Sequence, residues 1–237
     1  MNVRAVFFDV DFTLIHPGPT FGGEGYRVFC ARFGISVDPA AFGQAIASAA
    51  SLLDRSEDAR YDHEIFVGYT RHIIEQMGGR GEQLDACARE IYREWAACQH
   101  FELYDDAPAV LRALVADGLR IGLISNSHRC LASFQSHFEL HGLIAAAVSS
   151  SEHGYMKPHP SIFEAALKLL DVAPREAVMV GDTVGHDIEG ALGAGMCAVL
   201  IHRGMVPHPR EPALAAAGVP TVRSLSELPP LLSGRPL

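Results

Sequence analysis

Continuous apolar runs alternate with amphipathic stretches along most of this chain. The first apolar run spans residues 3–10 and is typical of a buried strand. Further strands are expected at residues 120–125, 146–150, 177–180, 197–202 and 221–222. Helices are expected at residues 106–118, 130–138, 161–170, 187–194 and 224–232. This alternation predicts an α/β fold built on a doubly wound parallel sheet.

The pattern changes between residues 17 and 99, where no credible strand occurs. After a stretch rich in proline and glycine, amphipathic segments with helical periodicity follow at residues 26–33, 42–53, 64–77 and 84–95. This block separates the first strand from the next helix of the α/β part. The sequence therefore predicts two domains, an α/β core of residues 1–16 and 100–237 and an inserted helical domain of residues 17–99.

The composition of the 237 residues narrows the possible partners. Hydrophobic residues make up 49% of the chain, which is enough for a sizeable core with a smaller inserted domain. The formal net charge of −9 disfavours non-specific binding to nucleic acid or anionic membranes, and no apolar run approaches a membrane span. Five scattered cysteines are typical of reduced thiols, so we expect a cytoplasmic protein without nucleic-acid or membrane partners. The oligomeric state does not follow from the sequence.

Polar residues with useful chemistry stand at the ends of the predicted strands. Asp9 and Asp11 follow the first strand, Ser125 and Asn126 end the second, and Asp182 follows a later one. A strand-like backbone would point the side chains of Asp9 and Asp11 the same way. In an open α/β sheet, the carboxyl ends of the strands converge on one crevice. A nucleophilic carboxylate, a hydroxyl and further carboxylates could therefore meet there.

Each of these motifs also has a structural explanation. A buried carboxylate such as Asp9 needs a metal or a cation, but Asp9 and Asp11 could instead begin a turn that Thr13 caps. Ser125 and Asn126 could bind an anion with the hydroxyl and the backbone N–H groups that follow, or they could form an ordinary turn. Both explanations remain open for each motif taken alone.

Two further motifs add a cation and a second carboxylate pair. Lys157 stands in the sequence Lys-Pro-His-Pro, where the prolines stiffen the loop. Its ammonium could neutralise charge on a transferring phosphoryl group, or it could be a solvated loop lysine. Asp187 lies five residues after Asp182, and carboxylate oxygens suit Mg²⁺, whereas a helix N-cap is the structural alternative. Together the four motifs favour a metal-assisted phosphoryl-transfer site.

Taken in order, the four motifs resemble those of the haloacid dehalogenase-like (HAD) hydrolase superfamily. The pattern D-x-D-x-T, a strand-end Ser, K-P and G-D-x-x-x-x-D is matched across residues 6–195. The resemblance implies a Rossmann-like core, and it implies that the inserted helices form the first type of cap found in that family.

The resemblance also implies roles for individual residues. Asp9 would attack phosphorus and form an aspartyl-phosphate, while Asp11 would protonate the leaving oxygen and then activate water. The phosphoryl group would be bound by Thr13, Ser125, Asn126 and Lys157. Thr13 would also support the loop after the nucleophile. A Mg²⁺ ion would be held by Asp9, Asp11 (through its backbone carbonyl), Asp182 and Asp187.

One position departs from the family pattern. The family usually has glycine where this chain has Phe12. On an extended segment the ring would point away from the metal and could narrow access or contact the cap. Further polar residues of the inserted block, namely Arg55, Arg60, Tyr61 and His63, could face the site or form a solvated loop.

The sequence thus predicts a Mg²⁺-dependent phosphomonoester hydrolase that acts on a small phosphorylated metabolite. The alternatives are a phosphomutase or a dehalogenase of the same fold, or a non-catalytic signalling module phosphorylated on Asp. Dehalogenases of the family lack the second aspartate of the first motif, which is present here as Asp11. Phosphonate-cleaving members and known mutases use a cap lysine, and residues 16–105 contain none. Signalling receivers are much shorter and lack an inserted helical block.

Overall fold

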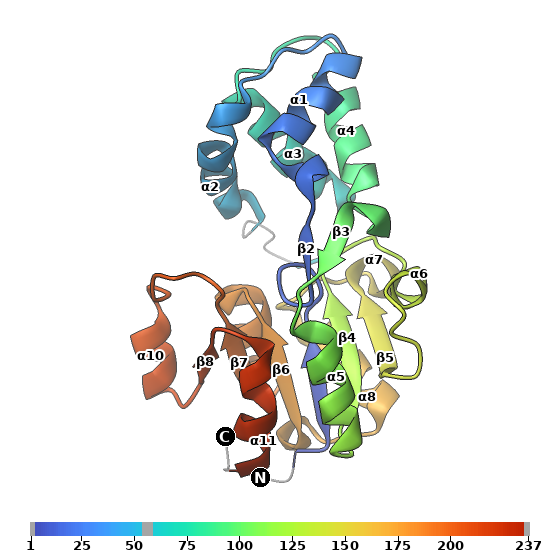
Figure 1. Ribbon diagram of the computed structural model, residues 1–237, viewed down its shortest axis with the longest axis vertical. Coiled ribbons are helices and arrows are strands. Elements are labelled where there is room, and N and C mark those ends of the chain that lie inside the picture. The colour runs from blue at the N-terminus through green and yellow to red at the C-terminus, as the bar shows by residue number, and fades with distance from the viewer. Residues whose placement is uncertain (1–2, 54–58, 235–237) are drawn as a thin grey trace. The chain divides into compact units, whose positions relative to one another are not determined.

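The computed structural model describes residues 3–53 and 59–234 and divides the chain into two compact units (Figure 1). The first unit, of α/β type, consists of Met1–His16 and Leu103–Leu237. The second unit is helical and consists of Pro17–Glu102. Arg55, a candidate substrate-selecting residue, lies outside the described residues.

Six parallel strands form the sheet of the α/β unit. They are β1 (Ala5–Phe8), β4 (Arg120–Ser125), β5 (Ile144–Ser149), β6 (Ala177–Gly181), β7 (Cys197–Ile201) and β8 (Thr221–Val222). Their order across the sheet is β5-β4-β1-β6-β7-β8, and every pair of neighbours is parallel. This is the strand order of a doubly wound Rossmann-type sheet, which confirms the predicted fold class.

Helices cover both faces of this sheet. They are α5 (Ala107–Ala116), α6 (Leu131–His137), α7 (Ser150–His153), α8 (Pro160–Leu170), α9 (Gly190–Gly193), α10 (Glu211–Ala216) and α11 (Leu228–Gly234). In Figure 1, α5 and α11 lie in front of the sheet and α8 lies behind it. Phe7, Phe163 and Met179 belong to one buried cluster that joins the sheet to α8. Because both faces are covered, every residue of β1 and β6 is buried, which explains their continuous apolar sequences.

Helices form the second unit. In the part of this unit that the structure describes, the α-helices are α1 (Gly23–Arg32), α2 (Phe42–Leu53), α3 (His63–Gln76) and α4 (Leu84–Glu94), and each begins and ends within three residues of its prediction. Aromatic packing contributes to the interior, since the Trp95 ring lies 4.5 Å from that of Phe21 and 5.0 Å from that of Phe101, centroid to centroid. The lone tryptophan therefore packs in this unit's core.

Several short elements were not predicted from the sequence. Two three-residue strands, β2 (Ile15–Pro17) and β3 (Phe101–Leu103), pair where the chain passes between the units. Helices α7 and α10, of four and six residues, are too short for an amphipathic pattern to repeat over several turns. The helix expected at 187–194 begins earlier, as a π-helical segment from Val184 to Glu189 that continues into α9. Short 3₁₀ turns lie at Pro19–Phe21, Pro39–Ala41, Cys98–His100, Pro174–Glu176 and Leu225–Glu227.

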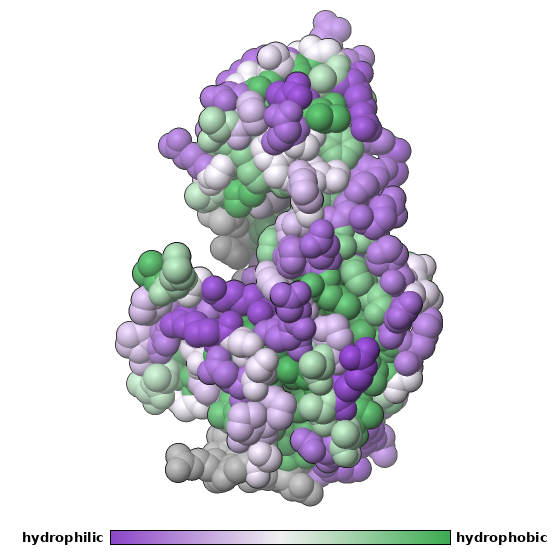
Figure 2. All heavy atoms as spheres, in the orientation of Figure 1, coloured by the Kyte–Doolittle hydropathy of each residue, from purple (hydrophilic) through white to green (hydrophobic). Residues whose placement is uncertain are grey.

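Among the helices of the described ranges, none combines the length and the apolar character needed to cross a bilayer. Figure 2 shows hydrophilic and hydrophobic residues interspersed over the viewed face of each unit. Large apolar side chains that remain exposed in the α/β unit include Met205 and Val206.

Candidate active site

The carboxyl ends of β1, β4 and β6 bring the predicted site residues to one edge of the sheet. The β1 strand is paired on one side with β4 and on the other with β6, so strand order reverses beside it. Directly after β1, the backbone N–H of Asp9 donates to the carbonyl of Val180 at 2.9 Å. Asp9 is therefore fixed to the neighbouring strand at the switch point, where ligands of such sheets bind.

Lys157 joins the segments that follow β1 and β6 to the last residues of strand β4, which ends at Ser125. Its Nζ donates to Asp9 Oδ1 and Asp187 Oδ1, each at 2.6 Å, and to the carbonyl of Ile124 at 2.8 Å. An ammonium has three protons to donate, and these three acceptors account for all of them. The residue is only 2% exposed, so it is not the solvated loop lysine that its sequence also allowed.

Electrostatics keeps this lysine charged. Burial alone would lower the pKa of Lys157, but the adjacent carboxylates of Asp187 and Asp9 raise that pKa above its ordinary value. A permanent positive charge therefore lies against Asp9.

Asn126 positions the same lysine through its backbone. The Asn126 Nδ2 donates to the Lys157 carbonyl at 2.9 Å, and the Lys157 N–H donates to Asn126 Oδ1 at 2.7 Å. Both polar atoms of the amide are thus used to fix the loop that carries Lys157. The contribution of Asn126 to phosphate binding stays a prediction.

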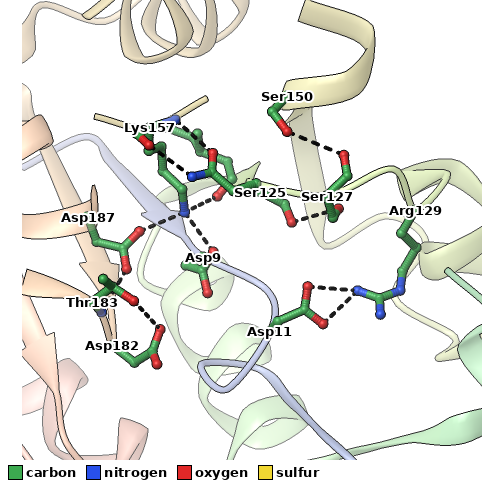
Figure 3. Close-up of polar contacts among 12 residues, drawn as sticks. Asp9, Asp11, Ser125, Ser127, Arg129, Ser150, Lys157, Asp182, Thr183 and Asp187 are labelled. Atoms are coloured by element: carbon green, nitrogen blue, oxygen red, sulfur yellow. Dashed lines mark hydrogen bonds and ion pairs between the residues drawn. The ribbon is translucent and has the colours of Figure 1, made fainter. Parts of the chain in front are cut away.

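Buried hydroxyls lie on the β4 side of the site. Ser125 Oγ donates to Ser127 Oγ at 2.9 Å, and Ser150 Oγ donates to the Ser127 carbonyl at 3.4 Å. All three serines are buried. Figure 3 shows Ser125 beside Lys157 and Asp9, where a hydroxyl can donate to an oxygen of a bound anion.

Three carboxylates form a cluster on the β6 side. One oxygen each from Asp9, Asp182 and Asp187 lies within 4.8 Å of the others. Burial raises the pKa of Asp9 to about 6, against the lowering effect of Lys157. Burial and the charge of Asp9 also raise the pKa of Asp182 well above its ordinary value. Three hard oxygen donors with unfavourable mutual charge match what a divalent cation such as Mg²⁺ binds.

Local backbone geometry places Asp187 in this cluster. Its Oδ2 accepts a hydrogen bond from the Thr183 N–H at 2.9 Å. Thr183 is the N-cap residue of the π-helical segment, so Asp187 does not fill the N-cap role considered as its alternative. A Cβ atom at Gly181 would lie 2.2 Å from the Asp187 carboxyl carbon, which means that only glycine leaves room for this carboxylate.

Asp11 lies apart from the three carboxylates and has its own cation. Arg129 Nη1 donates to both of its carboxylate oxygens, at 2.9 and 3.1 Å (Figure 3). Burial raises the pKa of Asp11, and the charge of Arg129 opposes that rise. Regular strand geometry ends at Phe8, so the strand rule that would point Asp9 and Asp11 the same way does not apply to Asp11. One carboxylate meets Lys157 and the other meets Arg129.

Comparison with known proteins agrees with this geometry. The family model described as haloacid dehalogenase-like hydrolase matches residues 3–195. The chain belongs to the haloacid dehalogenase-like hydrolases. It is 32% identical to the human N-acylneuraminate-9-phosphatase over 98% of this chain and 94% of that protein. It is 30% identical to the glyceraldehyde 3-phosphate phosphatase of Methanopyrus kandleri over 85% of each chain.

Solved structures show the same fold. The HAD-hydrolase YfnB of Bacillus subtilis, solved with bound magnesium, superposes with a TM-score of 0.74 at 16% identity, over 98% of this chain and all of that one. The protein is therefore a HAD-like hydrolase whose curated relatives include phosphatases.

The departure from the HAD pattern at Phe12 has a conformational consequence. Residues 12–14 form a turn and not the extended segment that was expected. Phe12 has a φ of +64°, a left-handed conformation that glycine adopts freely and aromatic residues rarely adopt. Its N–H donates to the Ile15 carbonyl at 2.7 Å, and its side chain is 44% exposed. The turn tolerates the ring by directing it outward.

Thr13 lies on the buried side of this turn. The residue is fully buried, and its Oγ1 has no hydrogen-bond partner among the described residues. The hydroxyl therefore does not form the local cap that was considered for it. Its carbonyl accepts a hydrogen bond from Arg203 Nη2 at 3.2 Å, which ties the turn to the loop after β7. A direct contact between Thr13 and phosphate stays a prediction.

Proposed function

We propose that this HAD-like hydrolase is a Mg²⁺-dependent phosphatase that cleaves a small phosphomonoester through an aspartyl-phosphate on Asp9. The observation that carries the proposal is the Lys157 ammonium at 2.6 Å from Asp9, beside a cluster of three carboxylates. The cation holds one oxygen of Asp9, which leaves Oδ2 to attack phosphorus. With a pKa of about 6, Asp9 is mostly ionised at neutral pH, as a nucleophile must be.

In the first step, Asp9 Oδ2 forms a bond to phosphorus and the bond to the ester oxygen breaks. Asp11 gives its proton to that departing oxygen, which leaves as an alcohol. In the second step, Asp11 takes a proton from water while the water oxygen attacks phosphorus. The bond between Asp9 and phosphorus breaks, and inorganic phosphate and the free Asp9 carboxylate result.

The other residues stabilise charge during both steps. The Ser125 hydroxyl, which donates to Ser127 in this structure, would turn to donate to a phosphoryl oxygen. The charge of Lys157, held in place by Asn126 and Asp187, would offset the negative charge between Asp9 and the phosphoryl group. Asp9, Asp182 and Asp187 fit the oxygen-donor set of Mg²⁺, with the Asp11 backbone carbonyl as a further expected ligand. When bound, Mg²⁺ would supply positive charge to the phosphoryl group.

The substrate class is supported by the relatives. Two phosphatases that resemble this chain along most of its length are named for phosphate esters of small metabolites. The presence of Asp11 disfavours dehalogenation, and the absence of lysine from residues 16–105 disfavours phosphonate cleavage and mutase chemistry.

A panel of small phosphomonoesters tests the proposal. We expect release of inorganic phosphate over many turnovers with Mg²⁺, and loss of that release in excess chelator. The Asp9→Asn variant serves as the control for contaminating phosphatases. Full activity in chelator would contradict the metal requirement, and a single stoichiometric release of phosphate would contradict an enzymatic function.

A further inference from the structure

Arg129 is a buried cation that the proposed reaction does not yet use. It lies in the loop between β4 and α6, and its side chain is 1% exposed. Among the described residues, Arg129 and Lys157 are the two cationic side chains that are buried. A charge removed from water in this way needs a partner of opposite sign, and the structure gives Arg129 the carboxylate of Asp11.

The two buried cations serve different carboxylates. Lys157 contacts Asp9 and Asp187, while Arg129 contacts Asp11. In Figure 3, the carboxylate of Asp11 points toward Arg129, and that of Asp9 points toward Lys157. The residue proposed as nucleophile and the residue proposed as acid and base thus each have a cation from a different loop.

We propose that Arg129 is a positioning residue, which holds the Asp11 carboxyl group in the orientation needed for proton transfer to the leaving oxygen. This role rests on the proposed function, because it assigns Arg129 to a step of that reaction. It goes beyond the family motifs, because Arg129 belongs to none of them.

The geometry explains how Arg129 would act. A single nitrogen, Nη1, lies within 3.1 Å of both oxygens of Asp11, so Arg129 anchors the carboxyl group and sets the direction in which it points. Asp11 begins the turn that contains the left-handed Phe12, so regular strand pairing does not orient it. When one oxygen of Asp11 carries the proton, the other still accepts from Nη1. A misaligned acid loses much of its rate advantage, so such support has a direct effect on catalysis.

A series of leaving groups separates this role from a merely structural one. The expulsion of 4-nitrophenolate needs little help from an acid, whereas an alkoxide must be protonated as it leaves. In Arg129→Gln, we expect kcat/KM for an alkyl phosphate, which reports the steps up to loss of the leaving group, to fall by about 10²-fold, the scale of general acid catalysis. For 4-nitrophenyl phosphate we expect a loss of kcat/KM of less than about tenfold. Arg129→Lys should recover part of the rate with the alkyl ester.

A double-mutant cycle provides the second measurement. If Arg129 acts through Asp11, then adding Arg129→Gln to an Asp11→Asn background should cost little further kcat/KM with the alkyl ester. Arg120→Gln is the matched control, because Arg120 begins β4 at the opposite end of the strand and donates to the Leu170 carbonyl. Circular dichroism and thermal unfolding of each variant show whether it is folded.

The outcomes distinguish the two proposals. Equal losses with both esters, or an undiminished loss in the Asp11→Asn background, would overturn the positioning role and leave the phosphatase function intact. A folded wild-type protein that hydrolyses no ester would contradict the proposed function and this role with it. If Arg129→Gln does not fold, Arg129→Lys against the same two esters decides the matter, since equal losses there would also overturn the positioning role.

Discussion

The two units of this protein place their charges in opposite ways. In the α/β unit, Lys157 and Arg129 are buried with their carboxylates at the ends of the strands. In the helical unit, ion pairs such as Arg71 with Glu75 and Arg89 with Glu64 lie between side chains that are about one-third to one-half exposed. Surface pairs contribute about 0–1 kcal/mol to stability, whereas buried pairs carry a large desolvation cost. The buried charges of the α/β unit are therefore better explained by chemistry than by stability.

The strongest test of this contrast is Asp9→Asn. The change removes the proposed nucleophile, so kcat should fall by about 10³-fold or more, the scale seen when a member of a catalytic unit is lost. The Lys157 ammonium keeps Asp187 as a partner, so we expect the variant to remain folded. Phosphate release and thermal unfolding should be measured together, with Glu75→Gln in the helical unit as the control. Turnover close to that of the wild type would exclude the covalent mechanism.

The second test removes a buried cation. Lys157→Met leaves Asp9 and Asp187 buried without their shared partner, so the free energy of unfolding should fall by about 3–5 kcal/mol. Added Mg²⁺ should restore part of the loss, since it brings positive charge to the same carboxylates. Arg71→Met, which breaks exposed pairs in the helical unit, should cost about 1 kcal/mol or less. If urea titrations gave similar losses of unfolding free energy for the two variants, then the burial of an ion pair would not determine how much it contributes to stability.

The third test uses pH, because the pKa of Asp9 is raised from its ordinary value of 3.8 to about 6. Metal and proton compete for this carboxylate, so Mg²⁺ affinity should weaken as the pH falls below about 6, by up to about tenfold per unit for each proton displaced. In the absence of metal, the stability of the fold changes with pH in the direction opposite to that of the Mg²⁺ affinity. The stabilising contribution of Asp9 to the folded state, which comes from its protonated form, is fully present below pH 3.8 and is lost as the pH rises through about 6. Calorimetric titration with Mg²⁺ between pH 5 and 7.5 measures the first effect, and an affinity independent of pH would exclude Asp9 as a ligand.

The smallest expected effect is that of Phe12→Gly. Left-handed backbone costs a non-glycine residue about 1–2 kcal/mol, and glycine loses about 0.5–1 kcal/mol through the freedom of the unfolded chain. Because the ring is 44% exposed, little apolar burial is lost, and the net change should stay within about 1 kcal/mol. The Mg²⁺ requirement should persist while relative rates across substrates change. A large drop in melting temperature with an unchanged substrate profile would show that the ring only packs on the protein.

The sequence predicted the sheet well because parallel strands are buried on both faces and are therefore continuously apolar. β4 lies at the predicted residues, and β1, β6 and β7 lie within two residues of theirs. The polar residues that end these strands were found for the same reason, since each interrupts an apolar run. The local sequence pattern was sufficient for strands and strand ends, because neighbouring residues determine these features.

Arg129 was missed because its partner lies 118 residues away along the chain. Nothing in the local sequence distinguishes this arginine from the many exposed ones, and only the fold brings it to Asp11. The turn at Phe12 is different, because a position where related chains usually carry glycine already indicates a left-handed backbone. That signal was present in the sequence, and an extended segment was nevertheless expected.

The central place of β1 has a consequence for how the chain folds during synthesis. β1 leaves the ribosome first, yet its partners on β4 begin only at Arg120 and those on β6 at Ala177. All four of its side chains are buried in the finished sheet, so until then an apolar strand has both edges unpaired. The intervening helical unit packs helices that follow one another in the chain, α2 on α3 and α3 on α4, and can form before β1 is paired. Non-local strand pairing is slow and prone to aggregation. β1 is therefore the strand of this sheet for which a chaperone would be needed most.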